Sequence, residues 1–151
     1  MRWLRCLCVP LVALLAGCLA TPSTTVPPPP LAAGAARIFL YRDNEPYESL
    51  DWVPVTFNGR EVGAVGPGLF FYRDVAPGTY SIDVITQSLW PDQARTVAAR
   101  AGETIYAKVG VLRNSAASDN SDQPVPTFAV DIMDPALARD EMSGLTQAAE
   151  R

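Results

Sequence analysis

The chain has 151 residues, a length typical of one domain, and a formal net charge of −4 at pH 7. An acidic chain without a basic cluster is a poor partner for nucleic acid, because neutralisation of phosphates supplies most of that binding energy. The sequence contains no histidine, which excludes Ser-His-Asp and Cys-His catalysis. We therefore expect no nucleic-acid partner and no cofactor.

The first 17 residues have the layout of a secretory signal peptide. Arg2 and Arg5 are positively charged, residues 6–16 are apolar, and small residues stand directly before Cys18. A helix that crosses a membrane needs about 20 apolar residues, and this run is far shorter. We interpret residues 1–17 as a signal peptide rather than as a membrane-spanning helix.

The order Leu15-Ala16-Gly17-Cys18 resembles the lipobox of bacterial lipoproteins. The resemblance implies that Cys18 becomes the first residue of the mature protein and carries a thioether-linked diacylglycerol, usually with a third, amide-linked chain such as palmitate. Two or more acyl chains hold a protein durably at a membrane, because burial contributes about 0.8 kcal/mol per methylene. Leu19 follows where Asp would resemble an inner-membrane retention signal, so we expect the outer membrane, with the domain facing the periplasm.

The cysteine count agrees with this interpretation. Cys6 and Cys8 lie in the signal peptide and Cys18 is the acylation site, so we expect a mature protein without a free thiol or a disulfide. Without histidine and free thiols, the usual zinc ligand sets are missing as well, and we expect no metal.

Residues 18–36 comprise the acylated cysteine and a proline-rich linker that contains Pro22 and Pro27 to Pro30. Proline favours the polyproline II conformation, which rises about 3.1 Å per residue, so residues 19–36 could reach about 55 Å. We interpret the linker as a spacer that holds the domain, residues 37–151, off the membrane surface.

Short alternating runs separated by Gly, Pro and Asn follow from Arg37 onward and predict β-strands. In residues 79–87, Tyr80 and Ile82 fall on the opposite side from polar neighbours, which is typical of a half-buried antiparallel sheet. Asn58-Gly59 supplies the positive φ values of a two-residue hairpin turn. The eight predicted strands cover residues 37–42, 53–57, 60–65, 69–75, 79–87, 95–99, 104–112 and 127–133. They predict a mainly β fold and favour a single antiparallel β-sandwich of about seven to eight strands, with a closed barrel as the alternative.

A short C-terminal α-helix is predicted after the last strand. Asp134 can cap it and Pro135 suits its first position. Ala138, Met142, Leu145 and Ala149 recur at helical spacing and form a narrow apolar stripe. A glycine inside the stripe, Gly144, costs about 1 kcal/mol relative to alanine, so we expect the helix to fray there.

The order of these landmarks resembles a known family. The landmarks are the lipobox, the proline-rich spacer, the opening strand Ala36 to Arg42, the Phe57-Asn58-Gly59 hairpin, Val75 to Tyr80, and Ala101 to Tyr106. Together they resemble a bacterial lipoprotein family described as a domain of unknown function (number 2846), a carboxypeptidase-regulatory or PEGA-like β-sandwich. The resemblance implies an extracytoplasmic β-rich module with no established activity and no catalytic residues to carry over.

Four acidic residues, Asp43, Glu45, Glu48 and Asp51, lie close together in the sequence. Carboxylates in such a cluster can gather around calcium or flank a glycosidic bond. The glycine and the alternating oxygen ligands of an EF-hand loop are absent, however, so we interpret the segment as a solvated acidic loop.

Four aromatic residues are candidates for a binding patch: Trp52, Phe70, Tyr72 and Trp90. Phe70 and Tyr72 alternate with the inward residues of the strand 69–75. Either they are exposed and bind a partner protein or a sugar chain, or both faces of the strand are covered, one by the opposite sheet and the other by the C-terminal helix.

The sequence thus predicts a membrane-anchored, non-enzymatic module that makes protein contacts at the cell envelope. The alternative is a module that binds peptidoglycan or another glycan, which the aromatic candidates and the acidic loop motivate. An enzyme that relies on carboxylates alone is the third hypothesis, since a fold does not dictate function.

Overall fold

The computed structural model describes residues 27–44, 50–86, 93–111 and 127–148. Within these ranges the strands are β1 (Ala36–Arg42), β2 (Val53–Phe57), β3 (Arg60–Val65), β4 (Leu69–Val75), β5 (Gly78–Val84), β6 (Arg95–Ala99), β7 (Thr104–Val111), β8 (Phe128–Ile132) and β9 (Thr146–Gln147), and the helix is α1 (Pro135–Met142). The predicted signal peptide, Cys18 and Trp90 lie outside the described residues.

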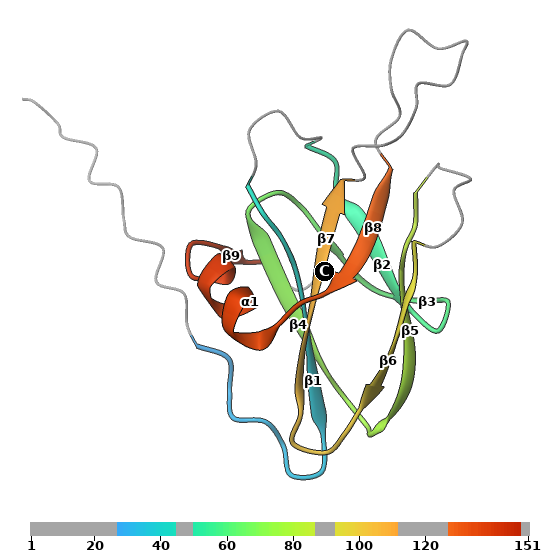
Figure 1. Ribbon diagram of the computed structural model, residues 1–151, viewed down its shortest axis with the longest axis vertical. Coiled ribbons are helices and arrows are strands. Elements are labelled where there is room, and N and C mark those ends of the chain that lie inside the picture. The colour runs from blue at the N-terminus through green and yellow to red at the C-terminus, as the bar shows by residue number, and fades with distance from the viewer. Residues whose placement is uncertain (1–26, 45–49, 87–92, 112–126, 149–151) are drawn as a thin grey trace, which may run out of the picture.

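The strands form two sheets that face each other, and α1 lies outside them (Figure 1). One sheet has the order β8-β7-β1-β4-β9 and the other the order β3-β2-β5-β6. The prediction of a mainly β fold with two sheets and one short C-terminal helix is confirmed. β1 to β8 lie close to their predicted bounds, because alternation and turn residues are local properties of the sequence.

The prediction that all strands are antiparallel is wrong, because two pairs of neighbours are parallel. β1 pairs in parallel with β7, with Ile38 opposite Ile105, and β4 pairs in parallel with β9. Parallel neighbours need a long crossover, and between β1 and β7 the chain supplies one by way of the other sheet. The alternation of apolar and polar residues in a single strand indicates which residues face inward. It does not indicate whether the neighbouring strand runs parallel or antiparallel.

The β2–β3 hairpin is confirmed as a two-residue turn. Asn58 has φ of 51° and Gly59 has φ of 78°, the pair of positive values that matches the twist of the flanking strands. Phe57 and Arg60 close the ladder on either side of the turn. The Asn58 side chain also accepts a hydrogen bond of 2.8 Å from the N–H of Ser81, which ties the turn to β5.

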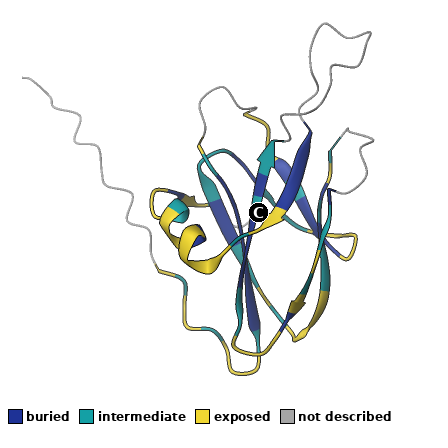
Figure 2. Ribbon diagram, viewed as in Figure 1, coloured by how far each residue is buried: buried dark blue, intermediate teal, exposed yellow. Residues whose placement is uncertain are grey.

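The main core is built from residues of both sheets, and the buried residues lie mostly on their strands (Figure 2). Alternate residues of each strand face inward, for example Ile38 and Leu40 of β1 and Val55 of β2. Full burial of such a side chain stabilises the fold by about 1.5–3 kcal/mol. Arg42 continues the inward series of β1, and its guanidinium lies 4.7 Å from the centre of the Phe128 ring.

A second apolar layer covers the outer face of the five-stranded sheet. It consists of the buried residues Phe39, Tyr41, Phe70, Tyr106, Ala138 and Leu145. Phe39 and Tyr106 stack with their ring centres 5.3 Å apart. Because Ala138 belongs to α1 and Leu145 follows it, the helix covers the side of the sheet that faces away from the main core. We call this group the aromatic layer.

The start of α1 is confirmed. The Asp134 side chain accepts hydrogen bonds from the N–H groups of Ala136, at 2.8 Å, and Leu137, at 3.3 Å, and Pro135 opens the helix. No helix in the described part of the chain is long and apolar enough to cross a membrane.

The end of α1 differs from the predicted apolar stripe, which continues past Met142. The helix stops at Met142 and the chain turns back to form β9 beside β4. The N–H of Thr146 donates to the Gly68 carbonyl at 3.0 Å, and the N–H of Ala148 donates to the Phe70 carbonyl at 2.7 Å. The exposed edge of β4 therefore offers backbone partners that compete with further helical turns, and Gly144 weakens the helix at that point.

Candidate functional site

The three longest connections between consecutive strands from β1 to β8 lie at the same end of the sheets. At one end, β4 joins β5 and β6 joins β7 through tight turns at residues 76–77 and 100–103. At the other end, residues 43–52, 85–94 and 112–127 connect β1 to β2, β5 to β6 and β7 to β8 (Figure 1). Long connections on a rigid scaffold are where binding surfaces concentrate. We call this end the loop end.

Exposed apolar side chains gather at the loop end. Leu50 is 84% exposed, Trp52 is 43% exposed and Ile85 is 54% exposed. Trp52 stands directly before β2, and the N–H of Ile85 donates to the carbonyl of Pro54 in β2 at 2.9 Å, so Ile85 lies beside the same strand start. We call Leu50, Trp52 and Ile85 the loop-end patch.

The predicted aromatic candidates do not all join this patch. Phe70 is only 4% exposed because α1 and its flanking residues cover it. Tyr72 is half-buried against the same aromatic layer. An exposed patch that includes Phe70 is therefore wrong, and the alternative, in which both faces of β4 are covered, describes its position. Of the described candidates, Trp52 alone is an exposed residue, at 43%.

The predicted acidic loop is described only at its ends, since Glu45 and Glu48 lie outside the described residues. Asp43 forms an ion pair with Lys108, whose Nζ lies 2.5 Å from Oδ2. The backbone carbonyl of Asp51 accepts a hydrogen bond from Arg42 Nη1 at 2.9 Å. Within the described ranges, no group of three or more acidic, cysteine or histidine side chains could hold a metal ion.

A polar network joins α1 to the sheet beneath it. The Tyr41 hydroxyl donates to Glu141 Oε2 at 2.7 Å, and Lys108 Nζ lies 3.0 Å from the same oxygen. Lys108 also pairs with Asp43. We call Tyr41, Asp43, Lys108 and Glu141 the helix network.

Burial and hydrogen bonding shift the pKa values of the helix network in consistent directions. Burial, with the hydrogen bond to Glu141, raises the pKa of Tyr41. Burial acts to raise the pKa of Glu141, but the hydrogen bonds from Tyr41 and Lys108 outweigh it, so the pKa is lowered. Burial acts to lower the pKa of Lys108, and its contacts with Asp43 and Glu141 raise it overall. The charged forms of Lys108 and Glu141 and the neutral form of Tyr41 are therefore favoured under the helix.

The helix network was not predicted from the sequence. Tyr41 and Lys108 occupy outward positions of two strands, and Glu141 lies one helical turn after Ala138. The signal was present in the alternation of the strands and in the helical spacing. The sequence patterns do not show that β7 lies next to β1, which brings Lys108 opposite Tyr41.

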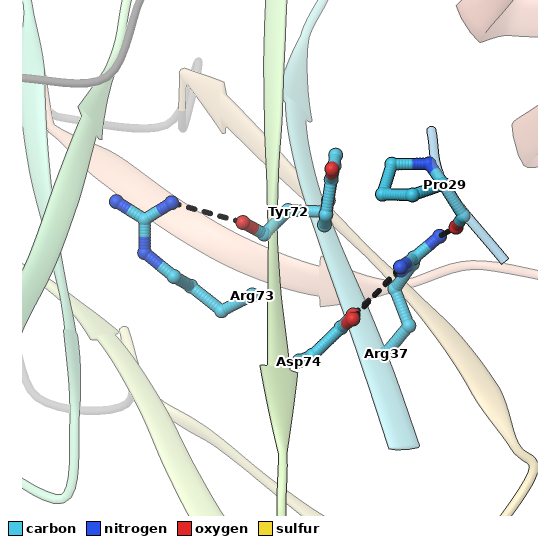
Figure 3. A network of polar contacts seen from close by, with 5 residues as sticks. All are labelled: Pro29, Arg37, Tyr72, Arg73 and Asp74. Carbon is cyan, nitrogen blue, oxygen red and sulfur yellow. Dashed lines mark hydrogen bonds and ion pairs between the residues drawn. The ribbon is translucent and has the colours of Figure 1, made fainter. Parts of the chain in front are cut away.

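A second polar cluster lies at the far end of β1 from the loop end (Figure 3). Arg37 is buried and binds Asp74 of β4 with two nitrogens, Nε to Oδ1 at 2.6 Å and Nη2 to Oδ2 at 2.8 Å. Its guanidinium lies 4.3 Å from the centre of the Tyr72 ring. The remaining nitrogen, Nη1, donates to the Pro29 carbonyl at 2.7 Å.

The charges of this cluster reinforce each other. The hydrogen bond from Arg37 lowers the pKa of Asp74, against a smaller effect of burial, and the same bond raises the pKa of Arg37. Arg73 points to the other side of β4 (Figure 3) and donates to the carbonyls of Val62 and Tyr72, each at 2.9 Å. The two neighbouring strands thus place Arg37 and Arg73 on opposite sides of the sheet with different partners.

The fold and these sites define a β module of two facing sheets with a helix over one outer face. The chain belongs to the family described as a protein of unknown function (DUF2846), which matches residues 32–122. The match begins just before β1 and ends between β7 and β8, so β8, α1 and β9 follow the matched region. No curated protein and no solved structure matches the chain.

Proposed function

We propose that the protein is a bacterial lipoprotein, anchored through Cys18 to the periplasmic face of the outer membrane, whose domain is a non-enzymatic module that contacts an envelope protein. The lipobox-like residues 15–18 support the anchor. The observation that carries the interaction is the loop-end patch, because Leu50 and Ile85 expose large apolar surface beside Trp52. Aromatic and apolar side chains on protruding connections are typical of protein contact surfaces.

The position of the N-terminal segment agrees with this arrangement. Arg37, which contacts Pro29, is at the opposite end of β1 from Arg42, whose Nη1 binds the Asp51 carbonyl. A domain that is attached to the membrane near Pro29 presents its loop end away from the attachment point. The loop-end patch is then accessible to a partner in the periplasm.

The anchor is tested by labelling cells with an alkyne analogue of palmitate and separating their membranes by density. We expect the wild-type chain to carry the label and to sediment with the outer membrane, and Cys18→Ser to lose both properties. Equal labelling of the two chains would contradict acylation at Cys18.

The contact surface is tested by photo-crosslinking in cells. A photoreactive amino acid is placed at position 50 or 85, and a matched control carries it at position 137, because Leu137 of α1 is also exposed and apolar, at 49%. We expect a reproducible protein adduct from positions 50 and 85 and none from 137. Adducts from all three positions, or from 137 alone, would exclude the loop-end patch as the contact surface.

A glycan ligand is the second candidate, and the exposure of Trp52 favours it, because a partly exposed indole can stack on a sugar ring. Sedimentation with purified peptidoglycan tests it. Binding that is lost in Trp52→Ala and kept in Leu137→Ala would replace the protein partner by peptidoglycan, whereas no sedimentation of the wild-type chain removes this candidate.

A further inference from the structure

Each of the three guanidinium nitrogens of Arg37 donates a hydrogen bond, and two of these bonds join β1 to β4 within the sheet. Nε and Nη2 bind the carboxylate of Asp74 in the planar geometry that suits a guanidinium. The guanidinium also lies over the Tyr72 ring, which restricts its movement. Nη1 is therefore held in one direction, and the atom that it meets is the Pro29 carbonyl, eight residues earlier in the chain.

The run Pro27 to Pro30 is a suitable partner for such a donor. A polyproline segment makes no internal hydrogen bonds, so its carbonyls remain available as acceptors, and its stiffness reduces the entropy lost on docking. Aromatic side chains commonly line the surfaces that bind such segments. The aromatic side chain next to the Arg37 guanidinium is Tyr72, which in turn packs against Phe39, with ring centres 5.6 Å apart.

Further contacts continue the attachment from Pro29 to β1. The N–H of Ala35 donates to the Ala32 carbonyl at 3.1 Å, and the Ala35 carbonyl accepts from the N–H of Gly102 at 2.7 Å. The N–H of Arg37 then donates to the Glu103 carbonyl at 2.9 Å. Residues 27–35, which the sequence assigns to the spacer, run along the domain before β1 starts (Figure 1).

We propose that Arg37, Tyr72 and Asp74 form a docking site for the polyproline segment of this chain, which makes residues 27–35 part of the domain and shortens the spacer. Residues 19–26 then determine the distance from Cys18, which is at most about 25 Å at 3.1 Å per residue instead of about 55 Å. The evidence for docking is the contacts of Arg37 with Pro29 and Asp74. The effect on the distance from the membrane rests on the proposed lipid anchor.

Docking is tested by limited proteolysis of the full mature chain in detergent with elastase, which cleaves after small residues such as Ala32 and Ala33, the cut sites being identified by mass. We expect cleavage within residues 31–35 to be at least about tenfold faster in Arg37→Lys, because lysine cannot bind Asp74 and Pro29 with one rigid fork. Pro29→Gly should show the same increase, because it keeps the carbonyl and removes the stiffness of the segment.

The matched control is Arg73→Lys, an equivalent change on the other side of β4 that does not touch Pro29. We expect it to be cleaved at the wild-type rate. Pro29→Gly lies outside the sheets and leaves their packing intact, so it decides the question if Arg37→Lys fails to fold. Wild-type cleavage as fast as in Pro29→Gly, or equal acceleration by Arg73→Lys, would overturn the docking site.

The membrane distance is tested with the acylated chain in vesicles of phosphatidylethanolamine and phosphatidylglycerol. Energy transfer is measured from a donor dye on Arg60→Cys, at the exposed start of β3, to an acceptor dye on lipid headgroups. We expect lower transfer in Pro29→Gly than in wild type, since undocking adds up to about 30 Å of reach. Equal transfer would overturn the shortening. If no variant binds vesicles while elastase still distinguishes them, the lipid anchor is wrong and the docking site stands.

Discussion

Tyr41 brings a hydroxyl group into the aromatic layer beneath α1, and Glu141 supplies its acceptor. A buried hydroxyl without a partner is costly, whereas a hydrogen bond to a charged group contributes about 1.5–3 kcal/mol. The carboxylate is itself compensated by Lys108. At the scale of residues, the attachment of the helix therefore depends on a charged network as well as on apolar contact.

We predict that Tyr41→Phe lowers the free energy of unfolding by about 1.5–3 kcal/mol, because it keeps the ring in place and leaves Glu141 with one partner fewer. Urea unfolding of the purified chain measures the change. The control is Tyr80→Phe, whose hydroxyl donates to the Ala76 carbonyl in an exposed setting and should cost less than about 1 kcal/mol. Equal losses in the two variants would show that the helix network does not stabilise the fold.

At the scale of elements, the positions of the strands follow from local sequence patterns. Which strands pair with each other does not follow from those patterns. The hairpin at Asn58-Gly59 is encoded by its own two residues. By contrast, the parallel pairing of β1 with β7 depends on how the intervening strands fold into the second sheet. β9 has two residues and exists because the edge of β4 accepts it, so no periodicity in Thr146–Gln147 could predict it.

We predict that Asp134→Ala destabilises α1 and lowers the free energy of unfolding by about 1 kcal/mol, because the N–H groups of Ala136 and Leu137 lose their acceptor. Urea unfolding measures the loss, and faster amide exchange of residues 136–138 locates it to the helix. Asp140→Ala, an exposed acidic residue of the same helix, is the control and should change neither. An effect of Asp140→Ala as large as that of Asp134→Ala would refute the capping role.

Two ion pairs, Arg37 with Asp74 and Lys108 with Glu141, make the stability of the whole molecule depend on pH. The pKa values of Asp74 and Glu141 are lowered in the folded chain, in Asp74 by the hydrogen bond from Arg37 and in Glu141 by bonds that outweigh burial. The unfolded chain therefore binds protons more readily than the folded chain as the pH falls. The contribution of the Asp74 and Glu141 carboxylates to the free energy of unfolding is complete above the ordinary carboxyl pKa, about 4. It is lost as the pH falls through the lower pKa values of the folded chain.

We predict that the free energy of unfolding decreases as the pH falls below about 5, and that the decrease is smaller in Asp74→Asn and Glu141→Gln. Urea unfolding at a series of pH values between 7 and 3 measures the slope. Asp140→Asn is the control and should keep the wild-type slope. A slope in Asp74→Asn and Glu141→Gln equal to that of wild type would show that neither pair responds to acid.

The candidate sites were only partly predictable, because they depend on how elements cover one another. Alternation places Phe70 and Tyr72 on the side of β4 away from the main core, and the structure agrees. Whether that side meets solvent depends on α1, which folds back over the sheet from the other end of the chain. Trp52 could be recognised as an edge residue, but its proximity to Ile85 follows from the pairing of β2 with β5.

The aromatic layer provides the last prediction, at the scale of the whole molecule. A chain that ends at Met133 lacks α1 and β9 and therefore exposes Phe39, Phe70 and Tyr106 together. Each of these side chains then loses burial that stabilises the fold by about 1.5–3 kcal/mol. An apolar patch of this kind promotes association. We therefore predict increased fluorescence of a bound hydrophobic dye and formation of oligomers in size-exclusion chromatography, with the strand signal in circular dichroism retained.

A chain that ends at Ala148 is the matched control, because it keeps α1, Leu145 and β9, and it should behave as wild type. If the shorter chain does not fold, Ala138→Asp provides the same test, since a charge at this fully buried helix position forces α1 off the aromatic layer while leaving both sheets complete. A folded chain ending at Met133, or a folded Ala138→Asp variant, that stays monomeric and binds no more dye than the control would show that the aromatic layer does not need α1 as its cover.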